Sequence, residues 1–125
     1  MFEQLSITRM AEALAGHAGA RLGLIARNVA QADTPGYKAM DLPDFAATYQ
    51  DGEAMRATRP GHFTSAARMM EPLAQPSWGE ASPDGNTVSL EHEMVKSVEV
   101  RQQSDMALAV YRNTADIIRA SLGRR

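Results

Sequence analysis

Apolar residues recur every three or four positions along the N-terminal part of the chain. This spacing places them on one stripe of an α-helix that runs from about residue 3 to residue 32. The stripe consists of Ile7, Ala11, Leu14, Ala18, Leu22, Ile25, Val29 and Ala32. Three glycines within the same segment, Gly16, Gly19 and Gly23, each cost about 1 kcal/mol of helix stability relative to alanine. They indicate either a locally weakened helix or the close approach of another backbone, and the pattern leaves both open.

A second amphipathic segment extends from about residue 89 to residue 122. Ser89 suits the N-cap position, and Glu91 and Glu93 suit the positive end of the helix dipole. The apolar stripe lies in the C-terminal half and consists of Leu108, Tyr111, Ala115, Ile118 and Leu122. Polar residues at positions 101–105 precede this stripe and separate it from the apolar residues near the start of the segment. The pattern therefore predicts two long helices, each about 45–50 Å in length.

The segment between the helices shows no sustained periodicity. It holds most of the prolines, which are Pro43, Pro60, Pro72, Pro76 and Pro83. Its scattered aromatic residues, Phe45, Tyr49, Phe63 and Trp78, are candidate anchors. A connection of this length is unusual within a compact domain, so we expect it to be disordered or to become ordered against a partner. We divide the chain into an N-terminal helix and turn (1–39), an irregular middle segment (40–87) and a C-terminal helix (88–125).

The predicted fold is all-α, with the two long helices paired in an antiparallel helical hairpin or coiled coil. Such a pair encloses no complete core and leaves apolar residues such as Leu5, Met10, Leu24 and Val110 on the outside. A helix pair of this kind is marginally stable alone, which predicts self-association or docking with other helices. The residues best placed to form a shared helix seam are Leu14, Leu22 and Ile25 on the first helix and Leu108, Ile118 and Leu122 on the second.

Composition narrows the class of protein. The chain has 125 residues, of which 44% are hydrophobic and 22% charged, close to globular averages. A net charge of −2 and a pI of about 5.9 argue against a nucleic-acid partner. There is no cysteine, so disulfides and thiol chemistry are excluded. The N-terminus does not resemble a secretory signal, and no apolar stretch approaches the roughly 20 residues of a membrane span.

The sequence offers no candidate catalytic, cofactor-binding or metal-binding site. His17, His62 and His92 are far apart and lack metal-ligand spacing, and His17 is expected on the flank of the first helix. Glu91 and Glu93 should point to different sides of the second helix, so they form no carboxylate pair. Asp84-Gly85-Asn86 resembles part of a calcium loop but lacks the remaining ligands. We therefore expect a protein that is not an enzyme and that needs no cofactor.

The most informative stretch is residues 28–38, which read Asn-Val-Ala-Gln-Ala-Asp-Thr-Pro-Gly-Tyr-Lys. Pro35 disfavours helical geometry at Thr34, and Gly36 can adopt a positive φ and reverse the chain. An ordinary helix stop needs only the Pro-Gly pair. The pattern here is longer and comprises Asn28, Val29, Ala30, Thr34, Pro35, Gly36 and Tyr37.

This pattern resembles the N-terminal signature of the flagellar axial proteins, the family that builds the rod, hook and hook–filament junction. Gln31 departs from it, because the family usually has a second Asn there. The continuation through Asp41-Leu42 and Asp44-Phe45 is most similar to the proximal rod proteins of the family. A second stretch, residues 84–94, resembles the segment that opens the family's C-terminal helix, with Ser89 where Asp is common.

The resemblance implies a structural subunit of the flagellar basal-body rod, the drive shaft that transmits torque from motor to hook. Its partners would be copies of itself, other rod subunits, and the membrane ring or export gate at the rod base. It would be exported through the flagellum's own channel without a cleaved signal peptide and reside in the periplasm-spanning rod. The residues alone leave a second reading open, a cytosolic helical-hairpin adaptor or export chaperone with a coincidental Thr-Pro-Gly-Tyr turn.

Overall fold

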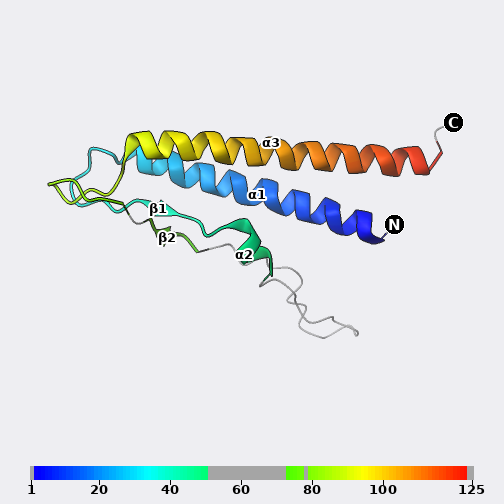
Figure 1. The fold of residues 1–125 in the computed structure, drawn as a ribbon, viewed down its shortest axis with the longest axis horizontal. Helices are drawn as coiled ribbons and strands as arrows, with labels where there is room; N and C mark the ends of the chain where they lie inside the picture. The colour runs from blue at the N-terminus through cyan, green and yellow to red at the C-terminus, as the bar shows by residue number, and fades with distance from the viewer. Residues whose placement is uncertain (1, 51–72, 78, 124–125) are drawn as a thin grey trace.

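Two long helices from the ends of the chain dominate the computed structural model, which describes residues 2–50, 73–77 and 79–123. Helices α1 (Phe2–Ala30) and α3 (Leu90–Ser121) pack along each other (Figure 1). Both termini lie at the same end of this helix pair, which we call the open end. Between the helices come β1 (Met40–Asp41), α2 (Phe45–Gln50) and β2 (Gln75–Pro76). The predicted, mainly helical fold with two long terminal helices packed together is confirmed.

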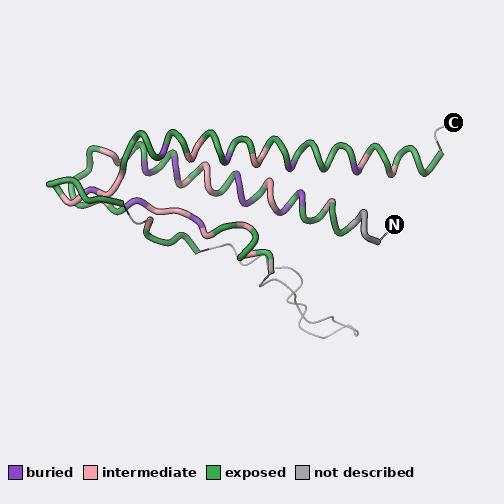
Figure 2. Tube along the Cα trace, in the orientation of Figure 1, coloured by how far each residue is buried: buried purple, intermediate pink, exposed green. Residues whose placement is uncertain are grey.

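Helix α1 is buried on two of its faces. Ala11, Ala18 and Ile25 are spaced by seven residues and face α3, with Ala18 fully buried against Val100. A neighbouring face carries Ala13 and His17, which are also buried. The segment that contains β1 and α2 packs against α1 there. Figure 2 shows the resulting series of buried positions along α1, and a sparser series along α3.

Helix α3 buries one narrow line of residues: Glu93, Val100, Ala107 and Thr114. A seven-residue spacing keeps one side of a helix against its partner. Two residues of the predicted stripe in α3, Leu108 and Leu122, lie outside this line and are 41% and 71% exposed in a single copy. Ile118 is half-buried. A search for large apolar residues could not find this line, because only Val100 is both large and apolar.

The prediction for the seam of α1 was closer. Ile25 is buried, Leu22 is half-buried and packs against the same core, and Leu14 is half-buried further along the helix. The ends of the predicted stripe, Ile7 and Val29, are 39% and 42% exposed. The stripe is therefore correct in its centre, where α3 and α1 lie along each other.

The three glycines inside α1 face away from the rest of the described chain. Gly16, Gly19 and Gly23 are exposed, and a Cβ placed on any of them would meet no atom within 4 Å. The close backbone approach that their spacing suggested does not occur within the described residues of one copy.

The helix ends lie near their predicted positions. Helix α1 ends at Ala30, and Gly36 adopts the expected positive φ of 74° in the turn that follows. Ser89 occupies the N-cap position of α3, but its side chain makes no capping hydrogen bond. Helix α3 therefore begins within one residue of its predicted start, and the hydroxyl of Ser89 does not cap it.

Part of the middle segment is described and is held close to the helices. Strands β1 and β2 pair in antiparallel fashion, with Met40 opposite Pro76 and Asp41 opposite Gln75. Two of the candidate anchors, Phe45 and Tyr49, pack on each other with ring centroids 5.3 Å apart. The other two, Phe63 and Trp78, lie outside the described residues.

Candidate functional site at the closed end of the helix pair

Asn28 is the central residue of the closed end, where the chain leaves α1 and later enters α3. Its side chain is fully buried and uses its whole hydrogen-bonding capacity. The Nδ2 group donates to Met40 O at 2.8 Å and to Glu93 Oε2 at 3.0 Å. The Oδ1 atom accepts from Met40 N at 3.1 Å and from the Tyr37 hydroxyl at 3.2 Å. One amide thus joins α1, the turn, β1 and α3.

Asn86 lies in the turn before α3 and binds the turn that follows α1. Its Nδ2 group donates to the carbonyl oxygens of Gln31 at 3.0 Å, Ala32 at 2.7 Å and Thr34 at 2.9 Å. These three residues form the turn that follows α1, which ends at Ala30. The Oδ1 atom of Asn86 accepts from Val88 N at 2.8 Å, which holds the residue in place before α3. Asn86 therefore fixes the turn after α1 across a large sequence separation.

Backbone hydrogen bonds join the two turns directly. The amide of Gly36 donates to Asp84 O, and the amide of Thr87 donates to Tyr37 O, both at 3.0 Å. The Thr87 hydroxyl accepts from Ala39 N at 2.9 Å. The turn after α1 and the turn before α3 therefore form one interlocked unit, which we call the turn lock: residues 28–40 and 84–93.

Two glycines in the left-handed region lie where the turns touch. Gly36 has φ of 74° and Gly85 has φ of 84°, a conformation that side chains disfavour. A Cβ on Gly85 would lie 3.5 Å from the Cα atom of Gly36. This is an ordinary contact distance, and a Cβ on Gly36 would meet nothing within 4 Å, so the positive φ and not a lack of space favours glycine at both positions.

Four charged side chains form a network beside the turn lock: Arg21 from α1, Asp41 from β1, and Glu93 and Lys96 from α3. Arg21 donates to Asp41 through Nε at 2.7 Å and Nη2 at 3.0 Å. Lys96 Nζ lies 3.3 Å from an oxygen of Asp41 and 3.3 Å from an oxygen of Glu93. Two positive and two negative charges cancel, and each has a partner of opposite sign. This arrangement offsets the large cost of burying Glu93, which is 2% exposed.

The pKa of Asp41 reflects this network. Burial raises it, but the hydrogen bonds and charge of Arg21, the Leu42 amide and the charge of Lys96 together lower it below its ordinary value. The hydrogen bond to Asp41 is also the main cause that raises the pKa of Arg21. The pair is therefore ionised at neutral pH and links α1 firmly to β1.

His17 was expected on the flank of the first helix, and this prediction was wrong. Its side chain is buried, and its Nε2 atom donates to Pro43 O at 2.9 Å. Its ring meets Phe45 edge-on, with centroids 5.7 Å apart. His17 is buried because the segment leading into α2 folds back over this face of α1. It therefore anchors that segment.

The turn lock brings together only part of the sequence motif. Asn28, Gly36 and Tyr37 take part directly. Val29, Ala30, Thr34 and Pro35 are exposed. Among these four, Thr34 still contributes, because its carbonyl accepts from Asn86 and its hydroxyl donates to Gln31 Oε1 at 2.6 Å. Gln31, the departure from the family pattern, thus keeps an amide contact at this position.

Sequence reasoning missed the partners of Asn28 and the charge network. Glu93 was assigned to the helix dipole, whereas it is a buried partner of Asn28. The available signal was its position seven residues before Val100, on the same side of α3. Asn86 was noted within a resembling stretch, but nothing local indicated that it would bind the turn after α1.

The described residues show neither a candidate metal site nor a candidate membrane span. Among the described residues, no group of three or more His, Cys, Asp or Glu side chains could hold a metal ion. Within that same part of the chain, no helix is long and apolar enough to cross a membrane. A scan against models of known protein families finds no match for this chain, and a search of curated proteins also finds none.

Proposed function

We propose that this chain is a structural subunit of the flagellar basal-body rod, of the proximal type, and that its helix pair is an antiparallel coiled coil. One observation carries the proposal. The two stretches that resemble flagellar axial proteins hold Asn28 and Glu93, which are 65 positions apart in the sequence yet hydrogen-bonded to each other. A chance Pro-Gly helix stop would not require a matching second stretch that binds it.

A drive shaft needs subunits that keep a fixed shape under torque. The turn lock and the charge network hold the direction in which the chain leaves α1 and enters α3. Each copy then presents the same surfaces to its neighbours. We propose that these neighbours are copies of this chain and other rod subunits, and that the membrane ring or export gate lies at the rod base.

The exposed apolar side chains of α3 support the proposal that this protein assembles with other subunits. Met94 and Val98 are 67% and 68% exposed, although neither is polar. Large exposed apolar side chains gathered on one face are typical of interaction surfaces.

We propose that the chain reaches its position through the flagellum's own export channel without a cleaved signal peptide. A helix pair with so little core is readily unfolded for such a passage.

Fractionation of cells tests this function. A tagged full-length chain should be recovered in detergent-resistant basal bodies, and so should the Val29→Ala variant, because the apolar side chain of Val29 is 42% exposed and makes no hydrogen bond in the turn lock. Asn28→Ala should be exported but poorly incorporated. Recovery of the unaltered chain only in the cytosolic fraction would instead favour an adaptor or export chaperone.

A further inference from the structure

Helix α3 carries an apolar patch on the face turned away from α1. Met94, Val95 and Val98 are 67%, 57% and 68% exposed. Val98 lies two residues before Val100, which is fully buried against α1. Two residues turn a helix by about 200°, so the patch and the buried line lie on opposite sides of α3.

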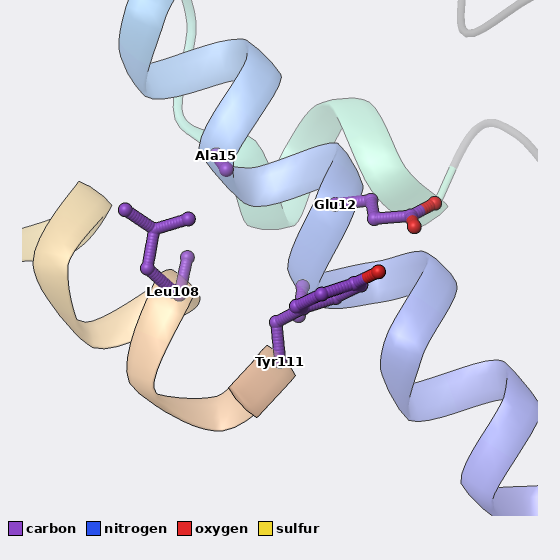
Figure 3. Close-up of a pocket in the computed structure, with 6 residues that line it drawn as sticks. Glu12, Ala15, Leu108 and Tyr111 are labelled. Atoms are coloured by element: carbon purple, nitrogen blue, oxygen red, sulfur yellow. The ribbon is translucent and has the colours of Figure 1, made fainter. Parts of the chain in front are cut away.

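A second surface, which could receive this apolar patch, runs along α1. A groove of about 220 Å³ between α1 and α3 is lined by Ala11, Glu12, Ala15, Ala107, Leu108 and Tyr111. Figure 3 shows Leu108 and Tyr111 of α3 beside Ala15 and Glu12 of α1. The exposed face of α1 continues from this groove past Gly16, Gly19 and Gly23, where it carries no side chains. Large apolar side chains can approach this surface closely.

The patch and the glycine face lie at the same level along the helix pair. The hydrogen bond between Asn28 and Glu93, 3.0 Å long, fixes the register of the two helices. Gly23 precedes Asn28 by five residues, and Val98 follows Glu93 by five residues. Because the helices run in opposite directions, both residues lie about 7.5 Å from that bond toward the open end. Two copies in the same orientation therefore meet without a large axial shift.

Exposed charges on the two surfaces are complementary. The α1 surface has Arg27 toward the closed end and Glu12 toward the open end. The outer face of α3 has Glu91 toward the closed end and Arg112 toward the open end. Copies in the same orientation bring Arg27 near Glu91, whereas Glu12 then lies between Asp105 and Arg112. Opposite orientations would place like charges together, which disfavours them.

We propose that the patch of one copy, Met94, Val95 and Val98, packs against the glycine face of α1, at the level of Gly19 and Gly23, in a second copy of the same orientation. Two different surfaces meet, so the contact is heterologous and repeats from copy to copy into a ring or a helix. This inference rests on the proposed rod function and names the contact by which copies of the chain assemble.

Cysteine cross-linking tests the contact, because the chain has no cysteine of its own. Purified full-length Gly23→Cys and Val98→Cys variants are mixed at high concentration and oxidised. The mixture should give roughly tenfold more cross-linked dimer than a mixture of Ala47→Cys with Val98→Cys, because the contact raises the local thiol concentration. A chain carrying both Gly23→Cys and Val98→Cys should form a ladder of trimers and longer products. Dimers of Val98→Cys with itself, or no excess over the Ala47→Cys control, would overturn the proposal.

A charge exchange tests the orientation. Arg27→Glu introduced into the Gly23→Cys partner should lower the cross-link yield severalfold, and Glu91→Arg in the Val98→Cys partner should restore it. No restoration would overturn the proposed pairing. The same cysteine pair examined in basal bodies separates this contact from the function. Incorporation without the Gly23–Val98 cross-link would overturn the contact alone, whereas cross-linking of purified protein that never enters basal bodies would overturn the rod function alone.

Discussion

At the scale of single residues, loss of the Asn28 side chain should have the largest effect on the free energy of unfolding. Truncation to alanine leaves the buried carboxylate of Glu93 without one of its donors and leaves both backbone groups of Met40 unpaired. Buried polar groups left in this state cost about 1–3 kcal/mol each. Asn28→Ala should therefore lower the free energy of unfolding by about 2–4 kcal/mol. Urea denaturation measures the change, with Val29→Ala as an exposed neighbour that should change it by about 0.5 kcal/mol or less. Equal effects of the two substitutions would contradict this role of Asn28.

Asp41 should make stability depend on acid pH. Its pKa is lower in the folded chain than its ordinary value of 3.8, so the unfolded chain takes up protons first as the pH falls. The stabilisation is therefore present above about pH 4 and is lost as the pH falls through the lowered folded pKa. The melting temperature should drop steeply on acidification below about pH 4, and less steeply in Asp41→Asn.

A matched control separates Asp41 from carboxylates in general. Asp116 pairs with Arg119 at 3.0 Å, but both side chains are largely exposed, at 70% and 78%. Exposed pairs of this kind contribute little to stability. Asp116→Asn should leave the acid profile unchanged. A profile altered equally by both substitutions would show that the buried network does not determine acid stability.

At the scale of elements, the turn after α1 depends on backbone geometry. Gly36 has φ of 74°, which a β-branched residue tolerates poorly. Gly36→Val should cost on the order of 1–2 kcal/mol and redirect the chain. Lys38→Ala removes only an exposed hydrogen bond to Gly85 O and should cost little. Motility at equal protein level compares the two, and equal motility would show that the turn geometry is unimportant.

The line of contact on α3 gives a sharper element-scale test. Val100 is fully buried, so Val100→Asp places an unpaired charge in the seam and should cost about 3 kcal/mol or more. Leu122 is 71% exposed, and Leu122→Asp should be nearly neutral for folding. Circular dichroism on heating distinguishes them. A larger drop in melting temperature for Leu122→Asp than for Val100→Asp would favour the stripe that was predicted from the large apolar residues.

The sequence predicted the elements well and their contacts unevenly. Periodicity located α1 because its buried positions, such as Ala18 and Ile25, are apolar. It did not find the line that α3 buries against α1, where Glu93 and Thr114 flank Val100 and Ala107. Glu93 is buried with a partner from a distant segment, Asn28, whereas the Thr114 hydroxyl donates to Val110 O within α3. A single sequence does not reveal such partners, and the turn lock was therefore predicted as a motif and not as a set of hydrogen bonds.

At the scale of the whole molecule, the helix pair should be only marginally stable as a single copy. Its closed end is tied by the turn lock, whereas its outer faces expose Met94, Val98 and Ile117. Burial of such surface against neighbours should stabilise the whole chain.

Hydrogen exchange on the isolated chain tests this view. Backbone amides in residues 41–50 and 79–83 should be weakly protected, and protection should rise when copies assemble. Amides inside the turn lock, such as those of Gly36 and Thr87, should exchange more slowly than those near the open end. A monomer that is fully protected throughout and melts cooperatively would contradict a dependence on assembly.

The most direct test of the central claim is a cryo-EM map of isolated basal bodies from cells that express this chain. The rod function predicts density in the rod wall for α1 and α3 of this chain, side by side and joined at the turn lock. A complete rod whose density is fully accounted for by other proteins would contradict the proposed function.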